Sequence, residues 1–165
     1  MAGYKSDFWF LPDYGVGAVL LTNADTGGFM NGPFGRRLLE VLFDGKPEAA
    51  GDLASAANAN KANLAKERKR LVVPADPAVV DRLAPHYTSK ELGRLDVVRA
   101  NGGTTFEFSE WSSAVASRKN DDGTISMITT DPTNSGFEFV VGERGDKRAV
   151  TLRDAQHEYV FYEVD

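Results

Sequence analysis

Two short apolar runs near the start of the chain, residues 8–11 and 16–21, flank a Pro-Asp-Tyr-Gly turn. Apolar runs of this length between turn residues predict buried strands, so we expect a β-hairpin. Pro12 fixes its own φ, and Gly15 or Gly17 can supply a positive φ if the turn needs one. Because residues 16–21 are apolar without alternation, we expect cover on both faces, with the hairpin at the centre of a sheet.

The next apolar pattern has the period of a helix. Phe34, Leu38 and Leu42 fall on one stripe, and Pro33 suits the first turn. We therefore predict a helix over residues 34–43 that lies across one face of the sheet. Burial of each large side chain on its stripe would contribute about 1.5–3 kcal/mol, so the packing is an integral part of the fold.

A polar segment rich in Ala, Asn and Lys follows at residues 48–72, with only a thin apolar line that includes Leu53 and Leu64. This pattern predicts a connecting helix. Its basic run, residues 66–70, has no interleaved aromatic side chains, so we interpret it as solvated cations near a helix C-terminus. The net charge of −5 also disfavours nucleic acid as a partner.

From residue 85 onward, apolar and polar positions alternate. Seven segments are predicted as strands: residues 92–100, 104–109, 111–119, 124–130, 136–143, 148–153 and 158–164. Seven or eight short strands with tight polar turns predict an antiparallel meander that curls or closes into a small barrel, and closure would also remove exposed edges. Asp76 and Pro77 predict a short helix before it, as N-cap and first residue.

The fold class expected from these patterns is α+β. Residues 1–46 form a hairpin and helix, residues 47–75 a helical linker, and residues 76–165 a barrel of about eight antiparallel strands. A chain of 165 residues with 42% hydrophobic content can bury a sizeable core.

Composition also excludes some chemistry. The chain has no cysteine, which excludes disulfides, thiol catalysis and cysteine metal sites. No apolar run approaches the ~18 residues of a membrane span. The start has no apolar signal core, and the pattern does not indicate a compartment.

Seven aromatic side chains are candidates for a ligand-binding barrel interior. They are Phe106, Phe108, Trp111, Phe137, Phe139, Tyr159 and Phe161. The alternative, favoured in so short a meander, is that they fill the barrel as core. His86 and His157 lack metal-ligand spacing, and Glu107, Glu110 and Glu138 alternate with apolar residues as outward-facing charges would. We therefore expect no catalytic residue, metal or cofactor in this chain.

The stretch GYKSDFWFLPDYGVGAVLLTN, residues 3–23, resembles the last two sheet strands of serine β-lactamase-like hydrolases. This group contains class C β-lactamases, penicillin-binding proteins, D-aminopeptidases and esterases. The Gly-(Phe/Tyr)-x-Ser start, the Leu-Pro-(Asp/Glu) turn and the Leu-Leu-Thr-Asn ending are typical of it. The helix at 34–43 is similar to the C-terminal helix of that domain, and many relatives then carry a lipocalin-like domain of this size.

The family's catalytic motifs are missing from this sequence. The family uses a Ser-x-x-Lys nucleophile, a Tyr-x-Asn or Ser-x-Asn partner, and a Lys-Thr-Gly or His-x-Gly strand. No serine of this chain has lysine at the third following position, and Tyr4-Lys-Ser and Tyr87-Thr-Ser do not fit the second motif. The resemblance therefore implies the non-catalytic C-terminal part of a longer hydrolase, with an accessory domain that covers or shapes the active site.

Two other functions stay open. The barrel alone would suit a binder of a small apolar ligand. Alternatively, the chain is a structural module that self-associates through residues 8–21 or 34–43, because an unpaired hydrophobic edge recruits another chain.

Overall fold

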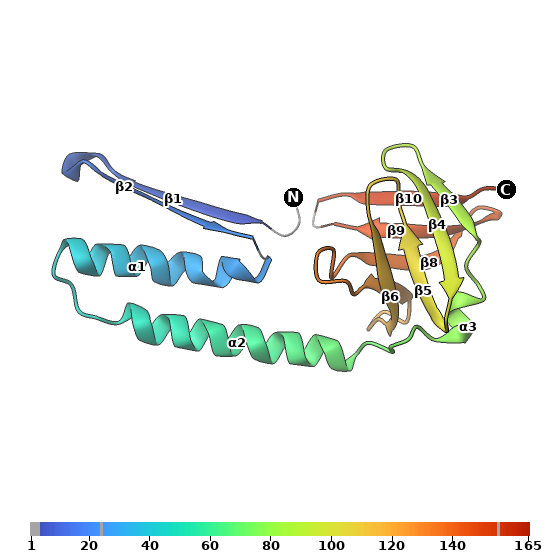
Figure 1. The fold of residues 1–165 in the computed structure, drawn as a ribbon, viewed down its shortest axis with the longest axis horizontal. Helices are drawn as coiled ribbons and strands as arrows, with labels where there is room; N and C mark the ends of the chain where they lie inside the picture. The colour runs from blue at the N-terminus through green and yellow to red at the C-terminus, as the bar shows by residue number, and fades with distance from the viewer. Residues whose placement is uncertain (1–3, 24, 155) are drawn as a thin grey trace. The chain divides into compact units, whose positions relative to one another are not determined.

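The computed structural model describes residues 4–23, 25–154 and 156–165, and its ribbon is drawn in Figure 1. The chain divides into two compact units, Met1–Glu67 and Arg68–Asp165. Unit 1 contains β1 (Lys5–Leu11), β2 (Val16–Thr22), α1 (Asn31–Leu42) and most of α2 (Ala49–Lys69), with two short 3-10 helices, Pro12–Tyr14 and Asp25–Met30. Unit 2 contains α3 (Pro77–Val80) and eight strands. These are β3 (His86–Ser89), β4 (Gly93–Ala100), β5 (Gly103–Glu107), β6 (Ser112–Lys119), β7 (Ile125–Thr129), β8 (Glu138–Arg144), β9 (Lys147–Arg153) and β10 (Glu158–Glu163).

The predicted hairpin is confirmed. β1 and β2 pair antiparallel, with Phe8 opposite Val19 and Trp9 opposite Ala18. In the turn between them, Gly15 has a φ of 62°, and its N–H donates to the Pro12 carbonyl at 3.2 Å. Glycine is needed here because other L-residues adopt this left-handed conformation at a cost.

The expectation that both hairpin faces are covered is wrong within this chain. Burial alternates along both strands, and the two strands form a sheet of their own. One face carries Phe8, Phe10, Val19 and Leu21, which are 78%, 67%, 64% and 73% exposed. We call these four residues the open face. The other face, which includes Trp9, is half-buried because α1 packs against it.

The half-buried face contacts α1 through Trp9 and Gly35. A Cβ added at Gly35 would lie 2.0 Å from Cζ2 of Trp9, so the indole packs directly on the helix backbone. The Trp9 Nε1–H donates to Oδ2 of Asp7 at 3.1 Å, which holds the ring in this position. Only glycine permits so close an approach.

Glu40 joins the two helices of unit 1. Its Oε1 accepts hydrogen bonds from the backbone N–H groups of Glu48 and Ala49, both at 2.7 Å, at the start of α2. These donors would otherwise lack a helical partner. Burial tends to raise the pKa of Glu40, but the two backbone N–H groups and Arg37 hold that pKa below its ordinary value of 4.5. Arg36 adds ion pairs with Glu48 and Asp52.

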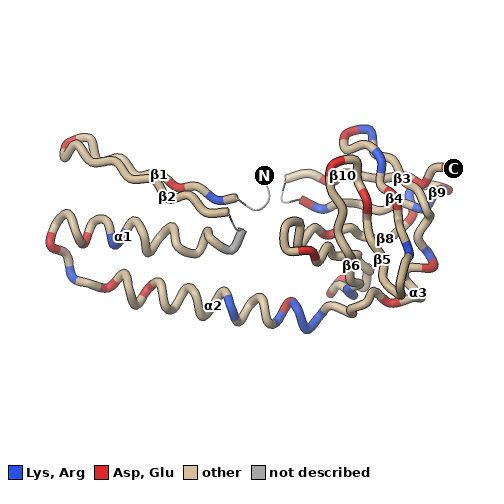
Figure 2. The backbone as a smooth tube through the Cα atoms, viewed as in Figure 1, with Lys and Arg blue, Asp and Glu red and all other residues tan. Residues whose placement is uncertain are grey.

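α2 is the predicted polar connecting helix, and Figure 2 shows the basic run at its C-terminal end. Within unit 2, Arg70 of this run pairs with Asp121 at 3.0 Å. Val72 then exchanges backbone hydrogen bonds with Ser117 of β6, at 2.9 and 3.2 Å. The segment after α2 is therefore held on the barrel by this ion pair and these hydrogen bonds.

Unit 2 is a closed antiparallel barrel with the strand order β10-β3-β4-β5-β6-β7-β8-β9, as predicted. β3 completes the eight strands, although its sequence, His-Tyr-Thr-Ser, has too few apolar positions to show the period. The β4–β5 turn is a two-residue hairpin in which Asn101 and Gly102 have φ values of 52° and 75°. Positive φ at both residues matches the twist of the flanking strands.

One end of the barrel is closed by α3. The Asp76 side chain accepts from the Ala78 N–H at 2.9 Å, which confirms the predicted cap. Val79, Val80 and Leu83 are buried in the same core as the barrel interior. At the other end of α3, Nη2 of Arg99 donates to the carbonyls of Val80 and Leu83 at 3.0 and 2.9 Å.

Gly35→Ala should destabilise unit 1 by about 1–3 kcal/mol, because the new methyl group displaces the Trp9 ring. Denaturant unfolding followed by Trp9 emission, in a Trp111→Phe background, measures this loss. The matched control is Gly32→Ala in the same helix, where an added Cβ meets no atom within 4 Å. Equal stability of the two variants would contradict the packing described here.

Unit 1 should also lose stability in acid through Glu40. Because its folded-state pKa is lowered, the carboxylate contributes fully above its ordinary pKa of 4.5, and the contribution disappears as the pH falls through the lowered value. We expect Glu40→Gln to reduce the melting temperature at pH 7 and to weaken its dependence on pH below 5. Circular dichroism at 222 nm reports on α1 and α2. Glu143→Gln, an exposed strand carboxylate, should keep the wild-type profile.

Candidate functional site

Three of the seven predicted aromatic residues form the filled centre of the barrel. Phe106, Phe139 and Phe161 have no exposed surface. The ring centroids of Phe106 and Phe139 are 5.3 Å apart, and those of Phe139 and Phe161 are 6.2 Å apart. Aromatic pairs at these separations attract each other beyond their burial. These three side chains are core and do not line an internal chamber.

Three others lie at the end of the barrel opposite α3. Phe108 and Trp111 stack with centroids 4.2 Å apart, and Trp111 lies 5.6 Å from Phe137. The backbone explains the stack, because the Phe108 N–H donates to the Trp111 carbonyl at 2.8 Å and closes the β5–β6 turn. All three are half-buried and pack on the core.

A cavity of about 380 Å³ opens at this end, and we call it the mouth cavity. Its walls combine apolar, aromatic and acidic side chains from three turns and from strands β8 and β9. The lining residues are Glu91, Leu92, Phe108, Ser109, Glu110, Trp111, Phe137, Phe139 and Leu152. The volume falls within the range of small-molecule sites.

Buried hydroxyl groups position the mouth. Ser113 Oγ accepts from the Thr130 and Asp131 N–H groups at 3.2 and 3.1 Å. Thr129 Oγ1 accepts from the Phe137 N–H at 2.8 Å. These bonds fix the β7–β8 loop and therefore the Phe137 ring. Single hydroxyls in strands carry no sequence signal for this role, so the sequence did not reveal them.

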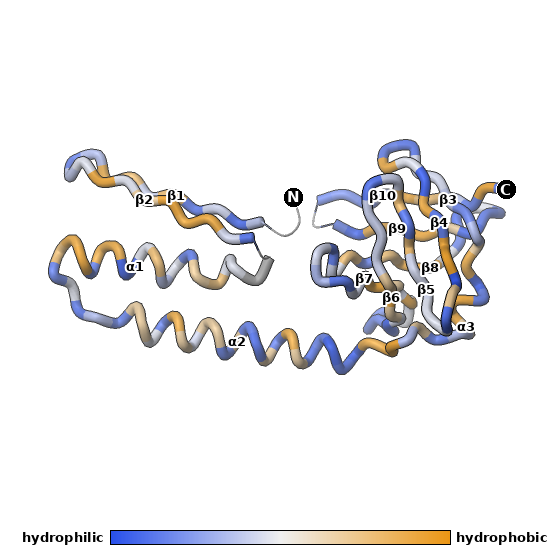
Figure 3. Tube along the Cα trace, in the orientation of Figure 1, coloured by the Kyte–Doolittle hydropathy of each residue, from blue (hydrophilic) through white to orange (hydrophobic). Residues whose placement is uncertain are grey.

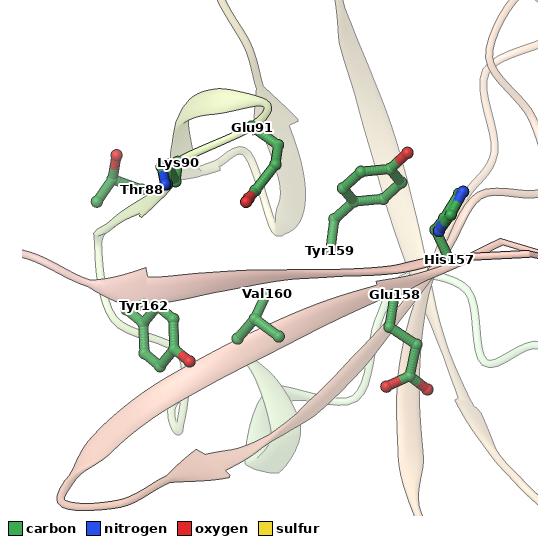
Figure 4. Close-up of a pocket in the computed structure, with 8 residues that line it drawn as sticks. All are labelled: Thr88, Lys90, Glu91, His157, Glu158, Tyr159, Val160 and Tyr162. Atoms are coloured by element: carbon green, nitrogen blue, oxygen red, sulfur yellow. The ribbon is translucent and has the colours of Figure 1, made fainter.

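Tyr159 lies at a different hollow, between β10 and the β3–β4 turn, which we call the seam groove (Figure 4). Its volume is about 820 Å³. Figure 4 labels its lining residues, which are Thr88, Lys90, Glu91, His157, Glu158, Tyr159, Val160 and Tyr162. The groove exists because β10 pairs with β9 over five residue pairs, and with β3 over only two.

Two hydrogen bonds show which neighbouring strand each backbone N–H and C=O group of β10 faces. The Val164 N–H donates to the His86 carbonyl on the β3 side, and the His157 carbonyl accepts from Asp154 on the β9 side. Since backbone groups alternate along an antiparallel strand, Val160 and Glu158 direct theirs toward β3. Pairing with β3 ends at Tyr162, so among the described residues no strand bonds the backbone groups that Val160 and Glu158 direct toward β3, although both residues pair with β9 on their other side.

His86 belongs to a polar cluster with Asp96 and Arg94. His86 Nδ1 lies 2.6 Å from Oδ1 of Asp96, and Arg94 Nε lies 2.8 Å from the same oxygen. Partial burial tends to raise the pKa of Asp96, but the bonds from His86 and Arg94 hold it below its ordinary value. This is an ion cluster on the outer barrel surface, with no nucleophile in it.

Glu138 differs from the free outward charge that alternation suggested. It accepts from Ser126 Oγ at 2.6 Å and from Asn120 at 3.1 Å, and it pairs with Arg118 at 2.8 Å. Burial alone would raise the pKa of Glu138, but the bonds from Ser126 and Arg118 lower it overall. The group ties β6, β7 and β8 together and is structural.

In the part of the chain that the structure describes, no three His, Asp or Glu side chains are grouped to hold a metal ion. Of the described helices, none has the length and apolar character to cross a membrane. Comparison of the chain with protein-family models, curated proteins and solved structures finds no match.

Amide hydrogen exchange should alternate along β10. We expect the Val160 and Glu158 amides to exchange at least about tenfold faster than those of Tyr159 and Phe161, which donate to β9. The Tyr162 amide is the internal control, since it points to the same side as Val160 but has β3 as partner. Uniform protection along the strand would contradict the open seam.

Proposed function

We propose that this chain is the non-catalytic C-terminal part of a serine β-lactamase-like hydrolase. Unit 1 would supply the last two strands and the last helix of the catalytic domain, and the barrel would be an accessory domain. The single observation that supports this proposal most strongly is that, among the described residues of unit 1, no large apolar side chain is fully buried.

Among the described residues of unit 1, Ala49 is the only apolar side chain that is buried. Large apolar side chains are exposed on both layers, and Figure 3 shows hydrophobic positions along the hairpin and α1. They include the open face and Leu39, Val41, Leu42 and Phe43. A cavity of about 370 Å³ also lies between β2, α1 and the start of α2. Folded proteins rarely leave so much apolar surface unless a partner covers it.

The arrangement of the elements supports the same proposal. A two-stranded antiparallel sheet is marginal by itself and depends on further strands or on packing against a helix, which α1 provides on one face only. The outer edges of β1 and β2 have no strand neighbour among the described residues. With α1 on one face, the hairpin matches the closing strands and C-terminal helix that the sequence resemblance implies. Further strands would pair with an edge, and another layer would cover the open face.

The implied reaction is acyl transfer. An activated serine attacks an amide or ester carbonyl, the leaving group departs, and water then releases the acyl group. The serine and its activating lysine would belong to polypeptide outside this chain. The barrel would cover or shape the mouth of that active site.

The enzymatic test compares this chain with the longer product of its reading frame. The chain alone should not turn over a chromogenic cephalosporin, a p-nitrophenyl ester or a D-alanine anilide. The longer product should contain Ser-x-x-Lys and hydrolyse at least one of them, and Ser→Ala in that motif should abolish turnover. A longer reading frame without the motif would overturn the proposal.

A structural role in self-association rests on the same open face. The isolated chain should associate at high concentration, because open-face side chains gain about 1.5–3 kcal/mol each on full burial. The paired exchange Phe8→Glu with Val19→Lys should return it to monomer, since the new charges lie directly opposite and preserve the hairpin. Sedimentation velocity at low and high concentration measures this.

The matched control places the same charges on another cross-strand pair, Val98→Glu with Thr105→Lys on the barrel. This exchange should leave association unchanged. A wild-type chain that sediments as a monomer at high concentration would contradict the role of the open face.

A further inference from the structure

We propose that the mouth cavity is a binding site for an organic ammonium ion with an apolar body. The occupant would lay its apolar part against the aromatic rings that line the cavity and place its positive charge at the acidic rim. This inference concerns unit 2 alone and does not depend on the proposed hydrolase.

The inner wall of the cavity suits an apolar body. Phe139 and Leu152 lie on the strand side of the cavity, and Phe139 has no exposed surface. Phe108, Trp111 and Phe137 supply aromatic rings that remain half-buried. Because the filled core lies behind them, a ligand enters only the mouth and does not penetrate the barrel.

The acidic rim of the cavity determines the sign of the charge that the ligand carries. Glu91 from the β3–β4 turn and Glu110 from the β5–β6 turn both line the cavity, and its lining includes no Lys or Arg. The Ser89 hydroxyl donates to Oε2 of Glu91 at 3.0 Å, which orients that carboxylate. Two carboxylates beside an apolar pocket attract a cation and repel a fatty acid or another anionic amphiphile.

The aromatic rings favour the same occupant. The face of Trp, and less strongly of Phe, attracts a cation within about 6 Å through its quadrupole. The rings pack on one another before a ligand arrives, with Phe108 stacked on Trp111 at 4.2 Å and Trp111 at 5.6 Å from Phe137. The site would therefore lose little side-chain freedom on binding.

The test uses three probes with one apolar chain and different head groups: octyltrimethylammonium, octanol and octyl sulfate. Each is titrated into the full chain below its micelle concentration, and the indole N–H resonances are followed by ¹H–¹⁵N NMR. Trp111 should shift and Trp9 should not. We expect the ammonium probe to bind about tenfold more tightly than octanol, and the sulfate more weakly than octanol.

Variants separate charge from apolar packing. Glu91→Gln with Glu110→Gln should bring the affinity for the ammonium probe several-fold closer to that of octanol, with only the attraction of the aromatic rings left, while octanol binding stays unchanged. The matched control, Glu107→Gln, alters a nearby strand carboxylate outside the cavity lining and should keep the preference. The inference is overturned if the three probes bind equally, if none shifts Trp111, if the sulfate binds best, or if the double variant retains the preference.

Discussion

A sheet of two strands with one helical layer can bury only one of its faces, and unit 1 is built under this constraint. Trp9 packs on Gly35 because α1 lies against that face of the hairpin. Phe8 and Val19, directly opposite each other on the other face, are largely exposed. The local structure is consistent throughout, with a tight turn, a cap on α2 and close packing. What is lacking is a second layer.

In the barrel, closure of the sheet buries one face of every strand without a second layer. Each of its eight strands has a neighbour on both sides, so most backbone groups are paired around the ring, with the seam between β10 and β3 as the exception, and one face of every strand is interior. The interior is filled by Phe106, Phe139 and Phe161, and α3 covers one end. Little apolar surface needs a partner, and the features left for binding lie at the edges of this architecture, in the mouth cavity and the seam groove.

These two solutions indicate different roles for the two units. A unit with few buried apolar side chains would gain stability if another domain covered its exposed apolar face. A closed barrel is stable by its own packing and can carry a site at its rim. Under the proposed hydrolase origin, the hairpin and α1 of the first unit would complete the end of a larger sheet. Chemistry at a serine would then be separate from recognition at the barrel.

Periodicity along the chain predicted most of the elements. The hairpin, α1, α2, the Asp76 cap and the closed meander follow from residues that are near neighbours in sequence, because strand and helix periods and turn chemistry act over a few residues. The inward position of the aromatic residues follows in the same way. The eighth strand, β3, was not predicted, because a four-residue strand shows too few repeats of its period.

Only the tertiary structure decided how those elements meet. Glu91 and Glu110 come together at the mouth because the β3–β4 and β5–β6 turns lie at the same end of the barrel. Glu40 caps a helix other than its own, and Tyr159 lines the seam rather than the mouth. The continuous apolar run of β2 predicted two covered faces, but cover depends on which layers the rest of the chain supplies. Cavities, caps and exposed faces arise from strand register and from packing between distant parts of the chain. A local pattern of side chains does not determine the register or the packing.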